Sequence, residues 1–146
     1  MDEKEYSSTY SNLKFDEILS SNNLRLTNAR KRIFAVLAAH HRPIKISGLI
    51  RSLAGEVDMT TVYRNIELFE KLDIINKIYT GWKYRVELSE KFRPHHHHLT
   101  CQNCGKIFPI DIGRKLESAI AKLGASQGFR PIEHELELRG LCKNCR

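Results

Sequence analysis

The sequence predicts an α+β fold, in which a helical N-terminal half ends in a β-hairpin and a smaller α/β part follows. Three observations support this prediction. Apolar residues first recur at helical spacing and then alternate in two short runs, 74–79 and 83–88. No acidic residue occurs between Glu17 and Glu56, although this stretch contains seven arginines and lysines. All four cysteines lie in two CxxC pairs in the last third of the chain.

Four short helices are expected before the hairpin. Leu13, Ile18 and Leu19 indicate the first helix. Thr27 or Asn28 is a suitable N-cap for the second and Ser47 for the third, because their side chains accept hydrogen bonds from the free N–H groups of a first turn. The residues expected to be buried are Ile33, Phe34 and Leu37 in the second helix, Leu49, Ile50 and Leu53 in the third, and Val62, Ile66 and Phe69 in the fourth, which begins near Met59.

The fourth helix leaves a polar face near its start, where Thr60, Tyr63 and Arg64 lie away from the apolar stripe. Such side chains can contact a thymine methyl group, a guanine edge or a phosphate. Helices followed by a hairpin around Thr80-Gly81-Trp82 predict a winged helix-turn-helix. The basic stretch without acids favours nucleic acid as the partner over a membrane surface or simple solubility.

The two CxxC pairs, Cys101/Cys104 and Cys142/Cys145, predict a tetrathiolate zinc site. Each CxxC turn presents two sulfur ligands, and zinc prefers four soft ligands in a tetrahedron. Four thiolates leave no position for water or substrate, so we expect a structural zinc. The alternative is two disulfides, which would need an oxidising compartment, and nothing in the sequence suggests export.

Four consecutive histidines, 95–98, stand directly before the first cysteine pair. An engineered tag is a poor explanation because the tract is internal and runs straight into Leu99. In an extended segment, His95 and His97 point to one face, and His96 and His98 to the other. One tract can therefore serve two metal ions. The alternative is a solvated strand whose histidines bind nothing.

A further histidine lies in a strand expected at 131–141. His134 shares its parity with Leu136 and Leu138, so it should point inward. The opposite parity, which should face water, is occupied by Glu133, Glu135 and Glu137. Taken alone, an inward histidine is usually a core residue that binds no metal.

Glu117 is the acidic candidate ligand. The helix expected at 112–127, with Asp111 as its cap, has an apolar stripe that Glu117 borders. The stripe consists of Leu116, Ile120 and Leu123. A cation shared with His134, His95 and His97 would give this carboxylate a partner, although a lone acid at such a border is often a surface residue.

Composition limits the remaining possibilities. The chain has 146 residues, 41% hydrophobic content and a formal net charge of +7, which fits one domain or two small ones. No apolar run approaches the roughly 20 residues of a membrane span. The acidic N-terminus lacks a signal-peptide core, so we expect a cytoplasmic protein with no membrane partner.

The motifs, taken in their order along the chain, resemble the ferric uptake regulator (Fur) family from about Leu13 onward. They are Thr61-Val62-Tyr63-Arg64, the histidine tract before Cys101-Gln102-Asn103-Cys104-Gly105, His134 eight residues before Cys142, and the final CxxC. The resemblance implies a metal-dependent transcriptional repressor that binds a palindromic operator in double-stranded DNA as a homodimer. It also implies a winged-helix DNA-binding domain at 1–88, a hinge at 89–94 and a dimerisation and metal-binding domain at 95–146.

Three metal sites are implied by the same resemblance. The structural zinc site corresponds to the four cysteines. The site inside the dimerisation domain corresponds to His95, His97, Glu117 and His134. An interdomain regulatory site, whose Zn²⁺ or Fe²⁺ closes the hinge and sets the two winged helices at operator spacing, corresponds for the most part to Glu87, His96 and His98.

The resemblance also implies DNA contacts. Arg25 matches a basic residue placed in the minor groove, and Tyr63 and Arg64 match contacts in the major groove. Thr60 and Thr61, at the same helix start, complete the predicted DNA-binding set.

The sequence departs from the family at the regulatory sites. Lys45 stands where a further interdomain histidine is common, so the fourth ligand is left to His40, His41 or Glu90. His97 stands where iron-type members commonly have an aspartate, and the added nitrogen suits zinc better than ferrous iron. Peroxide-sensing relatives use an aspartate in place of Glu87, which disfavours that branch.

We therefore expect a repressor of metal-uptake genes with Zn(II) as corepressor, acting by a population shift. An Fe(II)-responsive regulator is the alternative. A metalloenzyme is disfavoured because the sequence has no HExxH and no nucleophile motif. A zinc-binding interaction or storage module without operator specificity is disfavoured by Tyr63 and Arg64 at the helix start.

Overall fold

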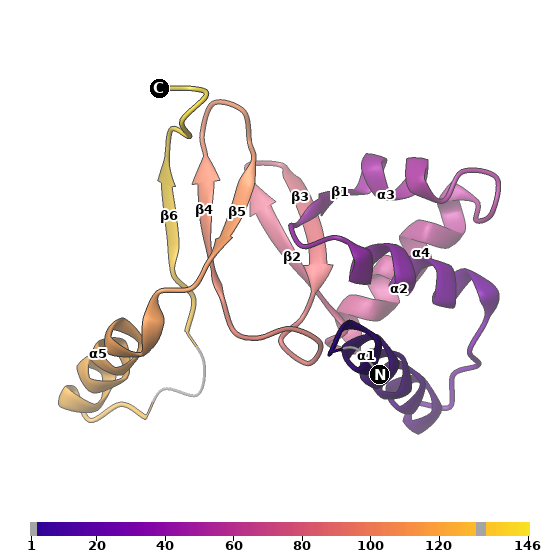
Figure 1. The fold of residues 1–146 in the computed structure, drawn as a ribbon, viewed down its shortest axis with the longest axis horizontal. Helices are drawn as coiled ribbons and strands as arrows, with labels where there is room; N and C mark the ends of the chain where they lie inside the picture. Colours follow the sequence, from indigo (N-terminus) through magenta and orange to yellow (C-terminus); the bar gives the residue numbers. More distant parts are fainter. Residues whose placement is uncertain (1–2, 131–133) are drawn as a thin grey trace. The chain divides into compact units, whose positions relative to one another are not determined.

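The computed structural model describes residues 3–130 and 134–146, with the side chains of the first helix described from residue 9 onward. The chain divides into two compact units, Met1–Pro94 and His95–Arg146. The first contains α1 (Glu3–Ser21), α2 (Asn28–Ala39), β1 (Ile44–Lys45), α3 (Ile46–Ser52), α4 (Met59–Lys71), β2 (Ile75–Thr80) and β3 (Lys83–Leu88) (Figure 1). The second contains β4 (His97–Cys101), β5 (Ile107–Ile110), α5 (Gly113–Ser126) and β6 (Glu137–Gly140). None of the described helices combines the length and apolar character that crossing a bilayer requires.

An aromatic cluster forms the centre of the first unit. The rings of Phe15 and Phe34 stack with centroids 4.2 Å apart, and Phe15 meets the ring of Phe69 edge-on at 5.4 Å. The apolar residues expected inside the second and fourth helices are all buried, as are Leu49 and Leu53 of the third, whereas Ile50 is partly buried. Helical periodicity therefore identified this core correctly.

The helix caps follow the sequence in one case and depart from it in another. The Thr27 hydroxyl accepts a hydrogen bond from the Arg30 N–H at 3.3 Å, so Thr27 caps α2 as expected. Ser47 does not cap α3, because Lys45 holds the N-cap position without a side-chain hydrogen bond. The reason is the short strand β1, in which Ile44 pairs with Val86. The chain passes from this strand directly into the helix at the buried Ile46.

The predicted hairpin is present as β2 and β3, in a sheet of order β1-β3-β2. Thr80 pairs with Lys83, so Gly81 and Trp82 form a two-residue turn. Gly81 has φ of 61°, the left-handed conformation that such turns require and that glycine adopts without strain. The first unit is therefore a winged helix-turn-helix.

The segment after β3 is fastened to the first unit. The Ser89 hydroxyl donates to the Asp73 carbonyl at 2.7 Å, and the Phe92 ring meets Phe34 at 5.1 Å. The Arg93 guanidinium donates to the carbonyl of Leu37 at 3.1 Å and to that of His40, at the C-terminal end of α2. Burial lowers the pKa of Arg93. The chain is thus held to the winged helix as far as Arg93.

The second unit is built on a sheet of order β5-β4-β6, with β4 antiparallel to β5 and parallel to β6. The strand expected at 131–141 is present only as β6; residues 131–133, including Glu133, lie outside the described residues. Asp111 does not cap α5, because Ile112 is the N-cap of this helix. The Asp111 carboxylate instead accepts a hydrogen bond from the Gly113 N–H at 2.7 Å. This i to i+2 bond is the local turn that aspartate often forms.

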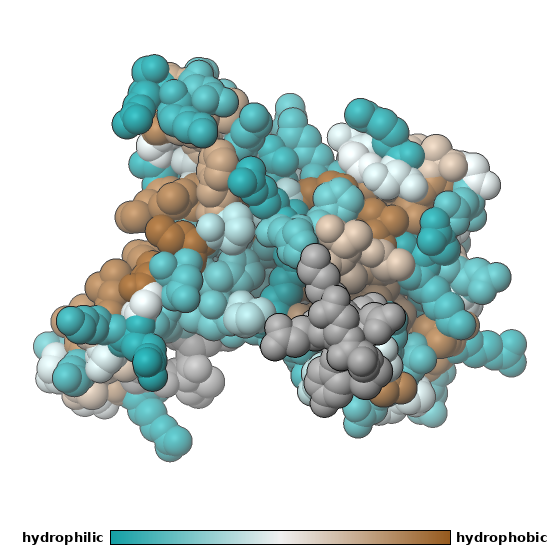
Figure 2. All heavy atoms as spheres, in the orientation of Figure 1, coloured by the Kyte–Doolittle hydropathy of each residue, from teal (hydrophilic) through white to brown (hydrophobic). Residues whose placement is uncertain are grey.

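The apolar stripe expected in this helix is present on α5, but it is not buried in the single chain. None of the residues of α5, which the structure describes in full, is itself buried, and Leu116 and Leu123 are 47% and 68% exposed. Leu138 of β6 is also exposed, and Figure 2 shows hydrophobic surface over these two elements. The periodicity of the helix was read correctly, but no other described part of the chain covers its apolar face. A contiguous apolar surface of this kind is typical of an interface.

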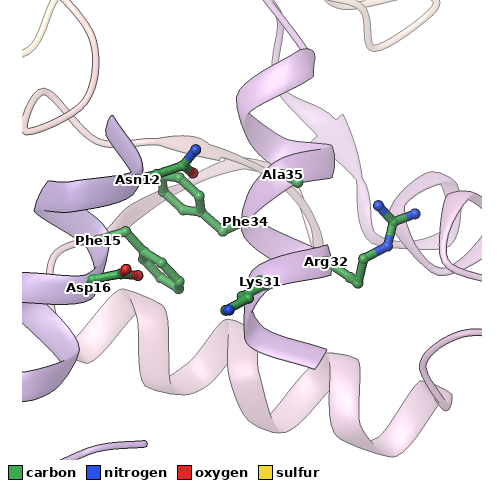
Figure 3. Close-up of a pocket in the computed structure, with 7 residues that line it drawn as sticks. All are labelled: Asn12, Phe15, Asp16, Lys31, Arg32, Phe34 and Ala35. Atoms are coloured by element: carbon green, nitrogen blue, oxygen red, sulfur yellow. The ribbon is translucent and has the colours of Figure 1, made fainter. Parts of the chain in front are cut away.

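A pocket of about 400 Å³ lies between α1 and α2, lined by Asn12, Phe15, Asp16, Lys31, Arg32, Phe34 and Ala35 (Figure 3). Its floor is formed by the two stacked core phenylalanines. Arg32 extends away from it and binds Glu56 with two hydrogen bonds. The other polar side chains that line the pocket are those of Asn12, Asp16 and Lys31.

Candidate metal centres and nucleic-acid interface

The structure brings all four cysteines together in the second unit, with ligand sulfurs within 4.8 Å of one another. The parallel pairing of β4 with β6 explains this, because Cys101 ends one strand beside Gly140 at the end of the other. Each strand then continues into its CxxC turn. All four cysteines are free thiols. The alternative to a zinc site, in which they form two disulfides, is therefore not present in the structure. Four sulfurs from two tight turns match the ligand set of structural zinc.

Hydrogen bonds favour the thiolate form of Cys101, which is the form that binds a metal ion. Backbone N–H groups, first that of Cys104 and then that of Cys142, lower the pKa of Cys101 to about 6. The Cys142 N–H lies 3.3 Å from the Cys101 sulfur. Cys104 and Cys142 have sulfurs 3.8 Å apart, and the hydrogen bond that the Cys145 thiol donates to Cys142 raises the pKa of Cys145 to about 12. One thiolate is thus available at neutral pH, and a bound cation would release the remaining protons.

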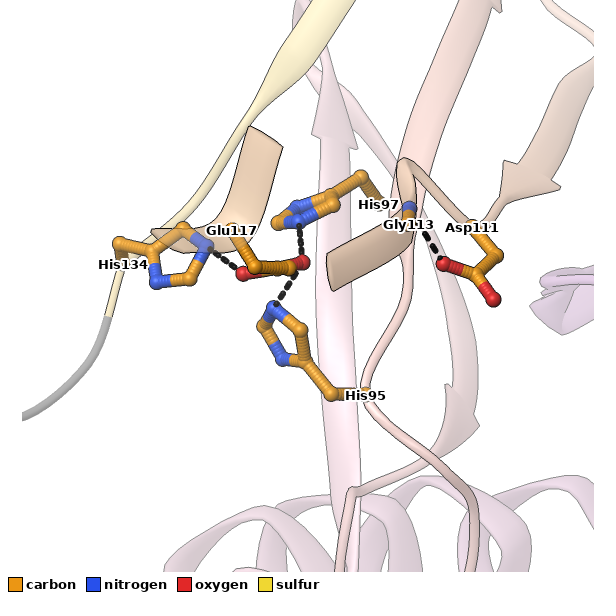
Figure 4. Close-up of polar contacts among 6 residues, drawn as sticks. All are labelled: His95, His97, Asp111, Gly113, Glu117 and His134. Atoms are coloured by element: carbon orange, nitrogen blue, oxygen red, sulfur yellow. Dashed lines mark hydrogen bonds and ion pairs between the residues drawn. The ribbon is translucent and has the colours of Figure 1, made fainter. Parts of the chain in front are cut away.

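A second cluster surrounds the Glu117 carboxylate (Figure 4). One oxygen, Oε1, lies 2.9 Å from His97 Nε2 and 3.6 Å from His95 Nε2, and the other, Oε2, lies 3.0 Å from His134 Nε2. The hydrogen bond to His97 is the main cause that lowers the pKa of Glu117, so the carboxylate stays ionised. The four residues selected by strand and helix parity therefore do converge in the structure.

Each ligand of this cluster comes from a different position in the second unit. His97 begins β4 and is 2% exposed, His134 precedes β6, and Glu117 lies near the start of α5. Three imidazoles and one carboxylate form a borderline ligand set that suits Zn²⁺ and other divalent transition metals. Which ion binds here stays a prediction.

Removing the charge of Glu117 should weaken this site alone. We expect Glu117→Gln to lower the affinity for the metal ion at this cluster by about 100-fold, because the carboxylate is its only anionic ligand. The cysteine site should keep its metal. Competition with a chromophoric chelator measures both. Ser118→Ala, an exposed neighbour on the same helix, is the matched control, and equal affinity in the two variants would contradict the assignment.

The regulatory ligands expected from the resemblance belong to both units. In the second unit, the rings of His96 and His98 meet edge-on with centroids 4.9 Å apart, and His95 and His97 form a separate ring pair. In the first unit, Glu87 lies on β3 opposite Asn76 of β2. A regulatory site that uses all three residues stays a prediction.

The start of α4 presents the expected polar face. Thr60, Tyr63 and Arg64 are exposed. Thr61 has a different role, because its N–H and hydroxyl both donate to the Asp58 carboxylate, at 2.9 and 2.6 Å. Asp58 is the N-cap of α4, which the sequence reading had not identified. The three exposed side chains can approach a groove while this cap fixes the helix start.

Two further residues that the sequence reading missed connect the predicted DNA contacts. The Arg30 guanidinium donates to the Arg25 carbonyl and, at 3.3 Å, to the Asn65 side-chain oxygen. Asn65 in turn donates to the Thr61 carbonyl of α4 at 2.8 Å. The signal was present, since Asn65 is a polar residue at a position where the helical stripe is buried. This network ties the loop that carries Arg25 to the first turn of α4.

A winged helix with a polar recognition face, joined to a unit that gathers thiols, imidazoles and a carboxylate, defines a metal-responsive DNA-binding regulator. Comparison with known proteins agrees: residues 21–139 match the Ferric uptake regulator family. The chain belongs to this family. Its members are metal-binding transcription repressors that bind DNA and are dimeric, and they are not enzymes.

Individual relatives cover nearly the whole chain. The ferric uptake regulation protein of Campylobacter jejuni is 32% identical over 142 residues, 90% of this chain and 86% of the relative. The ferric uptake regulator of Helicobacter pylori, described as having three functional metal binding sites, superimposes with a TM-score of 0.82 at 20% identity, covering 94% and 92% of the two chains. A zinc-bound manganese uptake regulator gives 0.67 at 26% identity, covering 87% and 97%. The predicted fold class is confirmed, and the relatives span several metals.

Proposed function

We propose that this protein represses metal-uptake genes with Zn(II) as corepressor and holds a structural zinc ion at its four cysteines. The observation that carries the choice of metal is the nitrogen-rich cluster around Glu117, in which His97 contributes a third imidazole. Nitrogen ligands favour zinc over ferrous iron, which accepts more oxygen. Because its target is chromosomal DNA, we place the protein in the cytoplasm.

An Fe(II)-responsive regulator is the second candidate. The Campylobacter jejuni relative, at 32% identity, is named for ferric uptake. The same ligand set can bind Fe²⁺ when that ion is more available in the cell, because selectivity depends on availability as well as on affinity.

The homodimer is proposed to form through the second unit. Leu116 and Leu123 of α5 and Leu138 of β6 are exposed on it. Apolar side chains of this size are normally covered, and two copies related by a two-fold axis would cover them with the same surface on each chain. Two winged helices would then be presented to two half-sites.

Metal control is proposed to act on the link between the units. A cation bound by Glu87 of the first unit and by His96 and His98 of the second would restrict their relative motion. Since the chain is fastened to the winged helix as far as Arg93, the pivot is proposed to lie in the residues that follow. The bound metal would raise the fraction of dimers with the correct spacing of winged helices, which is a population shift.

DNA recognition is assigned to α4 and the loop before α2. Tyr63 and Arg64 are proposed to contact base edges in the major groove, and Arg25 to enter the minor groove. The bonds from Arg30 to Arg25 and Asn65 support this assignment, because they fix the two contacting segments relative to each other.

One experiment tests the proposed function. The exchangeable metal is first removed from the protein. The protein is then used to select duplexes from a random pool in the presence of Zn(II), of Mn(II), or of Fe(II) under exclusion of oxygen. The affinity for the selected duplexes is measured by fluorescence anisotropy. We expect Zn(II) to give binding to the selected palindrome about a thousandfold tighter than to a scrambled duplex. A response to Fe(II) alone would select the second candidate.

A matched pair of variants identifies the reading helix in the same assay. Arg64→Ala should lose most of the preference for the selected duplex, whereas Arg114→Ala, an exposed arginine of the second unit, should keep it. Equal binding of the wild-type protein to every duplex, falling equally with salt, would contradict a sequence-specific repressor.

A further inference from the structure

Trp82, the only tryptophan of the chain, stands at the tip of the β2–β3 hairpin. Its side chain is 102% exposed, which is unusual for the largest apolar side chain. The turn that carries it has only two residues, so Trp82 is held at the end of a paired hairpin and not on a long loop. The metal sites and the polar face of α4 leave this residue without a role.

Side-chain contacts hold the hairpin in place near its tip and along its middle. Tyr79 and Tyr84 lie opposite each other with ring centroids 5.7 Å apart, and Tyr84 packs against the core of the first unit. The Lys77 ammonium lies 4.9 Å from the centre of the Tyr84 ring. The same ammonium pairs with Glu67 at 2.8 Å and with Glu70 at 2.7 Å, both on α4. The hairpin is therefore fixed to the proposed recognition helix.

This attachment sets where the tip lies. The short turn at 72–74 joins the end of α4 to the start of β2, and in this view the helix and the strand make an open angle at this turn (Figure 1). From Lys77, Trp82 lies five residues further along the hairpin, about 16 Å. The tip therefore projects well beyond the point at which the hairpin is bonded to α4.

The charge at the tip favours DNA as its partner. No acidic residue occurs between Asp73 and Glu87, and Lys83 directly follows Trp82 and is exposed. A lysine beside a projecting indole can pair with a phosphate while the ring packs against sugars or inserts at a base step. The indole N–H is also a hydrogen-bond donor for the acceptors on the floor of the minor groove.

We propose that Trp82 is a DNA contact of the wing, which packs into the minor groove beside the half-site bound by α4, with Lys83 on the adjacent phosphate. This inference rests on the proposed function for the position of α4. The contact is made mainly to sugar and backbone, so it adds affinity and register with little selectivity among bases.

Fluorescence gives a direct test, because the full chain has no other tryptophan. Saturation of the metal-loaded wild-type protein with the selected duplex should quench Trp82 emission and shield it from iodide. Trp82→Ala should bind that duplex about tenfold more weakly, and Trp82→Phe should recover part of the loss. Tyr10→Ala, an exposed aromatic of α1, is the matched control and should bind as the wild type does.

Duplex length makes the test specific. When the duplex is trimmed at both flanks, the affinity of the wild-type protein should fall to the affinity that Trp82→Ala has for the full duplex. The affinity of Trp82→Ala should be the same for the trimmed and the full duplex. Unchanged emission together with unchanged affinity of Trp82→Ala would overturn the inference and leave the proposed function intact. Quenching that depends on protein concentration and not on DNA would also overturn it, since it would indicate contact between copies.

Discussion

Replacing Cys142 with serine is expected to unfold the second unit while the winged helix stays folded. Among the described residues of that unit, only His97, Thr100, Cys101 and Ile107 are buried. So small a core does not hold a sheet by itself, whereas structural zinc can contribute on the order of 10 kcal/mol to folding. Loss of one thiolate removes most of this contribution, and it also releases β6 from the end of β4.

Circular dichroism and zinc analysis measure this effect. Cys142→Ser should lose the bound zinc and the dimer, and limited proteolysis should remove the second unit and leave the first. Asn144→Ser, a substitution in the same turn that keeps all four sulfurs, is the matched control. A stable folded dimer of Cys142→Ser without zinc would show that the site is not structural.

The double variant His96→Ala/His98→Ala is expected to abolish metal-dependent operator binding without unfolding the protein. Both imidazoles of the proposed regulatory site are lost, so metal no longer joins the two units. Affinity for the selected duplex should fall to the non-specific level, a loss of about a thousandfold. The side chains are half-buried, and the cysteines, Glu117 and its three histidines are unchanged.

Anisotropy with and without metal measures this loss, and the metal-free wild-type protein is the reference state. The variant should match that reference at every metal concentration and keep its structural zinc and its dimeric mass. A metal response like that of the wild type would refute the regulatory assignment. A parallel His41→Ala variant tests whether that histidine supplies the fourth ligand in place of Lys45.

Much of the fold followed from local patterns. Val62, Ile66 and Phe69 at three- and four-residue spacing identified α4, and alternation around Gly81 identified the wing. These predictions succeeded because a helix or hairpin that is buried on one face repeats that face in the sequence. The cap of α3 failed because the pairing of β1 with β3, a contact distant in sequence, sets where that helix begins.

The candidate metal sites were also accessible from the sequence. The spacing within CxxC places two sulfurs in one turn, and strand parity separates His95 and His97 from their neighbours. The Arg30 to Asn65 bond was not accessible, since it joins residues 35 positions apart and depends on how α2 packs on α4. The exposure of Leu116 and Leu123 was not accessible for a related reason, because periodicity shows that a face is apolar without showing what covers it.

The sequence alone determined which residues have the chemistry of this regulator: four thiols, a histidine tract with two faces, and a helix start with Tyr63 and Arg64. Residue type and short spacing are local properties, so one strand or one turn is enough to express them. Only the tertiary structure decided that three imidazoles converge on Glu117, that Arg30 links the two DNA-contacting segments and that Trp82 projects from a hairpin bonded to α4. These depend on packing between distant segments, which local periodicity does not encode.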